Sequence, residues 1–213
     1  MDDIKLEEKT VEENTELAVA EQPSSIANIW SNDAAWKMAV QRVKVLAQSD
    51  LVPDNYKNKP ANCMIAMDIA NRKGMSPLMV MQNLYVVKGK PSWSGQYCIN
   101  AVNSCGQFSR LEFVKILDDK GGIKGYMARA TDLRNGKLCE GAPVTWDMVK
   151  GEGWLDKPGS KWKTMPDQMF QYRAAAFFVR THCPEVLDGL YTKDEMNDVY
   201  GYDEKKEPVV INV

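Results

Sequence analysis

The chain has 213 residues, of which 44% are apolar and 26% are charged. This is the composition of an ordinary globular domain that is long enough to bury a large core. Five cysteines without a C-x-x-C pair and a single histidine argue against a structural zinc site and favour reduced thiols. No apolar run approaches the ~20 residues of a membrane span, and the acidic N-terminal segment is unlike a signal peptide. We therefore expect a soluble cytoplasmic protein.

The net charge of −2 conceals an asymmetry along the chain. Residues 1–22 hold eight acids and two lysines, a balance of −6, and residues 194–213 hold six acids and two lysines, a balance of −4. Residues 23–193 keep 23 basic and 15 acidic side chains, a balance of +8. A basic centre with acidic ends is typical of a polyanion binder whose tails compete with the ligand. Two solubilising tails around an ordinary domain would give the same pattern, and charge alone leaves both interpretations open.

The N-terminal part of the sequence predicts a tail followed by three helices. Residues 1–28 are acidic and lack apolar periodicity, which indicates a disordered segment. Ser31 or Asn32 can cap a helix that runs to about Ser49. A second helix over residues 61–73 ends at Gly74, and a short third helix begins at Pro77. The apolar face expected for the first helix consists of Trp36, Val40, Val43 and Ala47.

Further along, the pattern changes to short strands. Residues 84–87 and 91–93 flank a Lys88-Gly89-Lys90 turn, which predicts a hairpin. The other elements expected are a helix over 94–104, strands over about 107–117, 123–131 and 138–145, and helices over 145–150 and 166–182. We therefore expect an α+β domain over residues 29–199, in which helices pack on one face of a small antiparallel sheet. The sheet is the hairpin plus a three-stranded meander, and a short acidic tail, residues 200–213, follows.

Several catalytic signatures are absent from the sequence. It has no G-x-x-x-x-G-K-[ST] loop, which excludes an ATP-driven strand exchanger, and no H-E-x-x-H, G-x-S-x-G or G-x-G-x-x-G. His182 lies near a predicted helix end, where we expect a capping or surface role. Asp118-Asp119 and Asp194-Glu195 are explained as turn residues and helix-start acids, which leaves no carboxylate cluster for a catalytic metal. We expect neither an enzyme nor a bound metal or cofactor.

The helix predicted over 166–182 carries two arginines in apolar surroundings. Arg173 and Arg180 are seven residues apart, so they point within about 20° of each other. A guanidinium keeps its charge and is rarely buried unpaired. Either acidic side chains or a bound polyanion must therefore partner both arginines.

The segment from Trp154 to Lys163 (WLDKPGSKWK) alternates cations with indoles. Proteins that bind single strands of nucleic acid combine basic grooves with aromatic platforms, and each stacked base contributes about 1–3 kcal/mol. Alternatively, Trp154 and Trp162 pack inward to anchor the loop, and the lysines are simply solvated. Because large aromatic side chains usually pack into cores, we favour inward packing for the tryptophans.

Two blocks of the sequence carry a family resemblance. The first is NRKGMSPLMVMQNLYVVKGKPSW, residues 71–93. The second consists of Trp162, Pro166, Met169, Arg173 and Arg180, followed by Gly189, Leu190, Tyr191, Asp194 and Glu195. In this order the blocks resemble the RecT/Redβ family of phage single-strand annealing proteins, whose pattern is W-x-x-x-P-x-x-M-x-x-x-[RK] leading to G-[LI]-Y-x-x-D-E. The resemblance extends from about residue 33 to residue 199.

The resemblance implies a continuous DNA groove. We expect Arg173 and Arg180 to serve this groove rather than an internal salt bridge, and the loop lysines to bind phosphates. Taken alone, Lys88 and Lys90 would be a solvated turn, and Arg72 and Lys73 would be partners of a helix C-terminus. The DNA-binding residues expected are Arg72, Lys73, Gln82, Lys88, Lys90, Arg129, Lys157, Lys161, Trp162, Lys163, Arg173 and Arg180.

The resemblance further implies an ATP-independent protein that binds single-stranded DNA and anneals complementary strands in phage recombination, in the cytoplasm of the bacterial host. The partners implied are single-stranded DNA, the annealed duplex intermediate, further copies of the chain in a ring or helical filament, and a phage exonuclease or host single-strand-binding protein, with no membrane. One rival is a single-strand-binding or replication accessory protein that coats DNA without annealing it. Another is a metal-dependent nuclease, which the lack of a carboxylate cluster disfavours.

Overall fold

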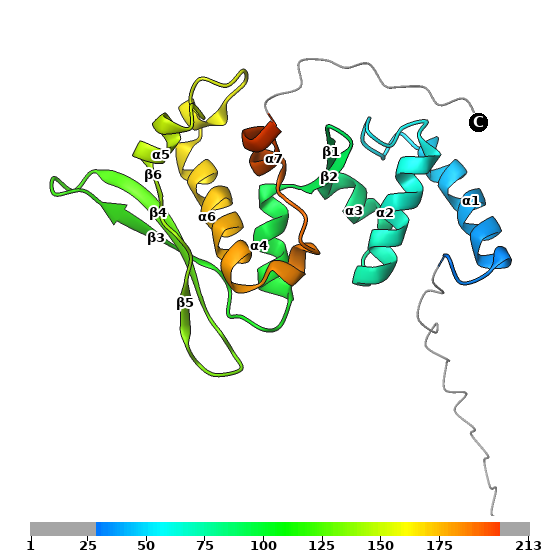
Figure 1. Ribbon diagram of the computed structural model, residues 1–213, viewed down its shortest axis with the longest axis horizontal. Coiled ribbons are helices and arrows are strands. Elements are labelled where there is room, and N and C mark those ends of the chain that lie inside the picture. The colour runs from blue at the N-terminus through cyan, green and yellow to red at the C-terminus, as the bar shows by residue number, and fades with distance from the viewer. Residues whose placement is uncertain (1–28, 201–213) are drawn as a thin grey trace, which may run out of the picture.

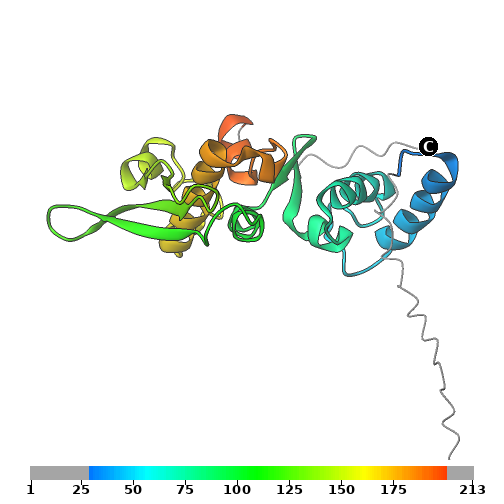
Figure 2. The ribbon, with the colours of Figure 1, turned by 90° about the horizontal axis from the view of Figure 1, so that it is seen from below.

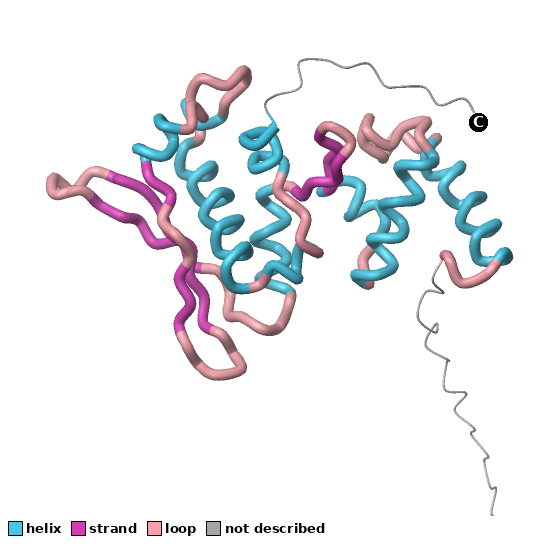
Figure 3. Tube along the Cα trace, in the orientation of Figure 1, coloured by secondary structure: helices cyan, strands magenta, loops and turns pink. Residues whose placement is uncertain are grey.

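The computed structural model describes residues 29–200, which form an α+β fold, as expected (Figures 1 and 3). The expected disordered segment, 1–28, and the expected acidic tail, 200–213, lie outside the described residues except for Tyr200, which ends the last helix instead of starting the tail. The helices are α1 (Asp33–Ala47), α2 (Pro60–Lys73), α3 (Pro77–Asn83), α4 (Gly95–Ser104), α5 (Trp146–Gly151), α6 (Pro166–His182) and α7 (Lys193–Tyr200), with 3-10 turns η1 (Lys161–Lys163) and η2 (Pro184–Leu187). The strands are β1 (Leu84–Val87), β2 (Lys90–Trp93), β3 (Glu112–Leu117), β4 (Ile123–Thr131), β5 (Leu138–Glu140) and β6 (Val144–Thr145). None of the helices in residues 29–200 is long and apolar enough to cross a membrane.

Helices α1, α2 and α3 form a lobe beside the rest of the protein (Figures 1 and 2). The N-cap of α1 is Asn32, whose side-chain oxygen accepts a hydrogen bond from the Ala35 N–H at 2.9 Å. The expected apolar face is wrong at Trp36, which is 40% exposed and packs against Trp30 with ring centroids 5.1 Å apart. Val43 and Ala47 are buried as expected, and Ala39 lies with them on the inward face that packs against α2.

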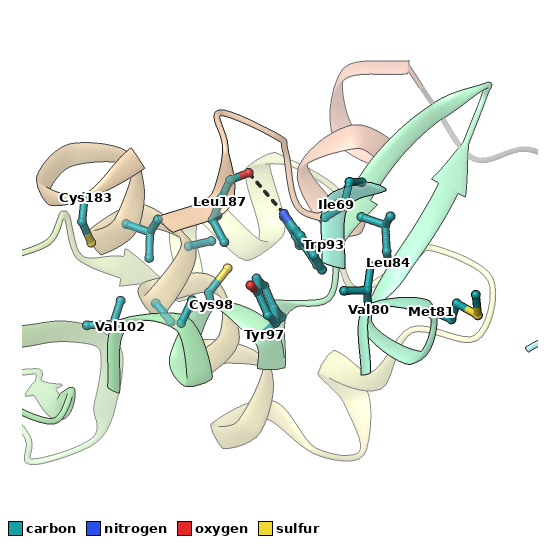
Figure 4. Close-up of a cluster of buried hydrophobic side chains, with 14 of the residues drawn as sticks. Ile69, Val80, Met81, Leu84, Trp93, Tyr97, Cys98, Val102, Cys183 and Leu187 are labelled. Carbon is teal, nitrogen blue, oxygen red and sulfur yellow. Dashed lines mark hydrogen bonds between the residues drawn. The ribbon is translucent and has the colours of Figure 1, made fainter. Parts of the chain in front are cut away.

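The predicted hairpin is confirmed and joins this lobe to the rest of the fold (Figure 2). Lys88 and Gly89 both have positive φ values, 48° and 77°, as a two-residue hairpin turn requires. At the other end of the hairpin, Trp93 is fully buried, stacks on Tyr97 of α4 at 3.9 Å and donates a hydrogen bond to the Leu187 carbonyl at 3.2 Å (Figure 4). Trp93 therefore connects the hairpin, α4 and η2 within one core.

The larger sheet has the order β3-β4-β5, with β6 also paired to β4. One expected strand over 138–145 is wrong, since it divides into β5 and β6. Arg129 of β4 pairs with Glu140 of β5, and Tyr126 of β4 pairs with Val144 of β6. The two β4 residues are three positions apart and their partners are four positions apart, so the β5–β6 segment contains one extra residue opposite β4, as in a β-bulge. At this break Gly141 passes so close to α6 that an added Cβ would lie 3.0 Å from the Phe178 backbone.

The strand expected from residue 107 begins at Glu112 instead. Phe108 makes an isolated bridge to Asp132, but the Leu111 N–H then donates to the Asn103 side chain at 2.8 Å rather than to β4. Backbone pairing persists at Ser109, whose N–H donates to the Thr131 carbonyl at 2.9 Å, and a side-chain acceptor interrupts the ladder only at Leu111.

Helix α6 packs on the inner face of the sheet and against α4 (Figure 1). Alternate residues of β4, namely Tyr126, Ala128 and Ala130, point into this interface and are buried. Phe170 of α6 stacks on Tyr126 at 5.3 Å, and the adjacent alanines 174, 175 and 176 let the helix backbone lie close to its neighbours. The position of α6 is therefore fixed, and with it the positions of both of its arginines.

Candidate nucleic-acid interface

Arg173 is buried within the protein. Its side chain is 6% exposed, its guanidinium lies 4.0 Å from the Trp154 ring centroid, and it forms an ion pair with Asp198 of α7. Arg173 thus has an internal carboxylate partner, and the expectation that it avoids an internal salt bridge is wrong. The sequence left acidic side chains open as an alternative, and for this arginine the structure supplies one.

Arg180 is held in the same way, one turn earlier along α7. Its Nε and Nη2 atoms donate to Oε1 and Oε2 of Glu195 at 3.1 and 3.0 Å, and Nη2 also donates to the Leu190 carbonyl at 2.9 Å. The Tyr191 ring covers the guanidinium at 4.4 Å. The expectation that this arginine would avoid an internal salt bridge is also wrong, because α7 lies across the arginine-bearing face of α6.

Glu195 is fixed by the start of its own helix. Its Oε2 atom accepts hydrogen bonds from the Thr192 N–H at 2.7 Å and hydroxyl at 2.9 Å, and the Glu195 N–H donates back to that hydroxyl. Burial raises the pKa of the Glu195 carboxyl, but the bonds from Arg180 and Thr192 outweigh burial and leave the pKa below its ordinary value. The prediction that Asp194-Glu195 starts a helix is confirmed.

Residues 154–163 form the basic loop, and its Lys157 shares the Asp198 carboxylate with Arg173. Desolvation lowers the pKa of Lys157, and the neighbouring Arg173 charge lowers it further. One carboxylate therefore serves two cations. Beside them lies a small open cavity of about 120 Å³, which is lined by Trp154, Lys157, Gly159, Ser160, Lys161, Trp162, Met169, Arg173, Asp194 and Asp198.

The loop tryptophans pack inward, as favoured from the sequence. Trp154 and Trp162 are 4% and 6% exposed, and their rings stack with centroids 5.4 Å apart. Trp162 also meets the Phe170 ring edge-on at 4.9 Å. Trp162 therefore anchors the loop by packing against Trp154 and Phe170, and its assignment as a DNA-contacting residue stays a prediction.

The lysines on either side of Trp162 remain on the surface. Lys161 and Lys163 are both exposed, and Lys163 lies 3.9 Å from Asp156 in a pair whose two side chains are 61% and 86% exposed. A pair this exposed contributes little to stability and is readily exchanged for another anion. The buried indole thus presents two cations to solvent beside the cavity.

The hairpin tip reaches α7 from the opposite side (Figure 1). Lys88 donates to the Tyr200 carbonyl, and Lys90 donates to the Tyr200 hydroxyl at 2.6 Å while lying 4.4 Å from the centre of its ring. Both lysines are exposed. Cations of the hairpin, the basic loop and α6 therefore meet around one short helix.

Other predicted residues lie elsewhere. Lys73 binds Asp188 at 3.1 Å and the Val186 carbonyl at 2.9 Å with its side chain 13% exposed, so it ties the helical lobe to η2. Arg72 binds Asp68 at 3.1 Å within α2, and Gln82 is exposed on α3. Arg129 pairs with Glu112 across β3 and β4 at 2.9 Å. These four do not join the cations around α7.

Sequence reasoning missed Asp198 and Tyr200 as parts of this arrangement. The available signal was the spacing of Asp194, Glu195 and Asp198, which brings three acids onto the first two turns of one helix. Within residues 29–200, no three His, Cys, Asp or Glu side chains gather so as to hold a metal ion.

Comparison with known families agrees with the resemblance seen in the sequence. The RecT family model matches residues 118–210, which include β4, the basic loop, α6 and α7. The second motif block, from Trp162 to Glu195, lies entirely within this match, whereas the first block, residues 71–93, lies before it. No curated protein matches the chain.

Proposed function

We propose that this protein is a member of the RecT family, whose model matches its residues 118–210, and that it binds single-stranded DNA and pairs it with a complementary strand without ATP. Membership of the family supports a role in single-strand annealing during recombination, and RecT-family proteins are annealing proteins rather than classical enzymes. The absence of ATP from the reaction, the residues that bind the strand and the partners are our proposals.

The observation that best supports the proposal is the meeting of cations from separate segments around α7. Lys88 and Lys90 approach from the hairpin and Lys157 from the basic loop, with Lys161 and Lys163 exposed next to it. Lysine is a point charge suited to phosphate oxygens, which every nucleotide carries. Such a surface binds a strand whatever its sequence, as annealing requires.

The mechanism follows from contacts to the backbone alone. When lysines hold the phosphates, the base edges stay available, and the arriving strand reads them by Watson–Crick pairing. The cations also reduce the repulsion between two polyanions as they approach. We propose that Arg173, Arg180 and Trp162 support the lysine-bearing segments from inside the protein, and that in the DNA-free arrangement they are not available for contact with a strand.

We also propose that copies of the chain assemble on the strand as a ring or helical filament. Exposed apolar side chains on α1 and α2 support self-association, with Met38, Val45 and Ile65 exposed by 51%, 72% and 55%. A phage exonuclease or host single-strand-binding protein as a further partner, and the cytoplasm of a bacterial host as the location, rest on the family resemblance.

The decisive experiment is annealing of two complementary oligonucleotides without ATP, followed by fluorescence quenching and by electron microscopy of the same samples. We expect faster annealing and visible assemblies. A protein that binds strands tightly without accelerating their pairing would be the coating or accessory protein of the rival hypothesis. Cleavage of either oligonucleotide on addition of magnesium would instead support the nuclease.

The salt dependence of binding offers an independent check. For single strands the logarithm of the binding constant falls with log salt by about 0.7 per neutralised phosphate, so four to six contacts per protomer give a slope of roughly −3 to −4. A slope near zero would contradict a binding surface made of lysines.

A further inference from the structure

Helix α7 is held very differently at its two ends. Its first turns are buried: Thr192, Met196 and Asn197 are 1%, 1% and 6% exposed, and Glu195 makes the two-point contact with Arg180. These contacts are apolar packing, a capping box and a largely enclosed ion pair. The start of α7 is therefore a fixed part of the fold.

The last turn of α7, residues 198–200, instead faces outward. Val199 and Tyr200 are 64% and 41% exposed. The contacts of this turn are polar and are made to cations, with Asp198 binding Lys157 and Arg173, and Tyr200 binding Lys88 and Lys90. The contacts of Lys88 and Lys90 are exposed and exchange readily with another anion, whereas Arg173 is buried and needs an anion in place of Asp198 when that contact opens.

The basic side chains around this turn outnumber the negative charges that the turn carries. Four basic side chains from the hairpin, the basic loop and α6 surround one carboxylate and a carbonyl at the negative end of the helix dipole. Oxygen acceptors spaced along the turn bind the same lysines and guanidinium that would bind successive phosphates. The turn thus offers one carboxylate and two neutral oxygen acceptors to cations that could bind phosphates instead.

We propose that residues 198–200 occupy a phosphate-binding site in the DNA-free protein, and that the backbone of single-stranded DNA displaces them while the start of α7 stays in place. This inference rests on the proposed function, and it adds that the last turn of α7 regulates access of DNA to the site. A buried guanidinium must keep an anionic partner, so Asp198 leaves Arg173 only as a phosphate replaces it. Binding of the strand is therefore coupled to movement of the last turn, and Arg173 joins the DNA contacts only in the bound state.

Carbodiimide cross-linking of the full chain tests this directly, because the reagent joins a lysine and a carboxylate in contact into an amide. Without DNA we expect Lys157–Asp198 and Lys73–Asp188 cross-links in digests analysed by mass spectrometry. A saturating oligonucleotide should reduce the first at least several-fold and leave the second unchanged. Persistence of the Lys157–Asp198 cross-link in a confirmed DNA complex would overturn the proposal while leaving the proposed function intact.

Bound DNA could also reduce the Lys157–Asp198 cross-link by keeping the carbodiimide away from these side chains. Two matched variants distinguish this shielding from displacement of residues 198–200. Asp198→Asn removes the competing charge, and Asp194→Asn removes an equal charge from the start of the same helix, beside the same cavity. We expect Asp198→Asn to bind single strands about three- to tenfold tighter than Asp194→Asn at low salt, with the difference shrinking as salt rises. Equal or weaker binding by Asp198→Asn would overturn the proposal. Failure of the unaltered chain to bind any strand would overturn the proposed function as well.

Discussion

Arg180 and Glu195 join two helices of the motif through a planar two-point contact, 15 residues apart in sequence. The same carboxylate accepts from Thr192, so one acidic side chain both caps α7 and fixes α7 to α6. We therefore expect the arginine and the glutamate of the motif to hold the two helices of the site together.

The first prediction concerns stability. Arg180→Gln should lower the free energy of unfolding by about 2–3 kcal/mol, because it leaves the largely enclosed Glu195 carboxylate without its partner. As a control, Arg72→Gln opens an exposed pair within α2 and should cost at most about 1 kcal/mol. Urea unfolding followed by circular dichroism measures both. Equal stability of the two variants would show that the Arg180 pair has no structural weight.

The second prediction is a pH dependence with a defined sign. The folded-state pKa of Glu195 lies below its ordinary value of 4.5, so the stability from this group is present above that value. It is lost as pH falls through the lower folded pKa. The difference in unfolding free energy between the unaltered chain and Glu195→Gln should therefore shrink with acidification below pH 4.5. A difference that stays constant there would contradict the assignment.

The third prediction tests the role of Trp162. Because its ring is buried against Trp154 and Phe170, Trp162→Ala should lower the free energy of unfolding by about 3–5 kcal/mol. Trp36→Ala, which removes the same side chain from a 40% exposed position, should cost about 1.5 kcal/mol or less. Denaturant titration decides between them. If Trp162→Ala keeps full stability and loses only strand binding, the indole is a base platform after all.

Many boundaries of helices and turns can be predicted from short local sequence patterns. Asn32 as a cap, Gly74 at the end of α2, the prolines at the start of α3 and α6, and the Lys88-Gly89 turn each specify a boundary within a few residues, and these boundaries are confirmed. The inward packing of Trp154 and Trp162 also follows from size and apolar character alone.

The remaining features depend on contacts between distant segments. Arg173 meets Asp198 across 25 residues, and no local pattern states whether an arginine faces a carboxylate or solvent. Likewise, the division of residues 138–145 into β5 and β6 arises where Gly141 meets α6, an approach that only the packed fold creates. Lys73 looked like a helix-end cation, yet it ties two parts of the molecule together through Asp188.

The fourth prediction concerns the basic loop. Replacing Lys161 and Lys163 together by Gln should weaken strand binding and reduce the magnitude of its salt slope by about 1.4, since each neutralised phosphate contributes about 0.7. Stability should be unchanged because both side chains are exposed. Lys57→Gln with Lys59→Gln removes the same charge from the α1–α2 connection. Equal slopes for the two double variants would place the strand elsewhere.

The last prediction concerns the leading acidic segment, which lies outside the described residues. Residues 1–22 carry −6 and are tethered to a central region of +8, so we expect them to compete with phosphates for the same cations. Deleting them should tighten strand binding at low salt, and the gain should fade as salt screens the charges. A chain in which the eight acids of this segment are replaced by Asn or Gln keeps its length and serves as the matched control, and it should behave like the deletion. Affinity measured for all three chains at two salt concentrations gives the answer.

Equal affinities at low salt would mean that the segment does not compete. Weaker binding by the deletion alone would show that the segment's presence, rather than its charge, assists assembly on DNA.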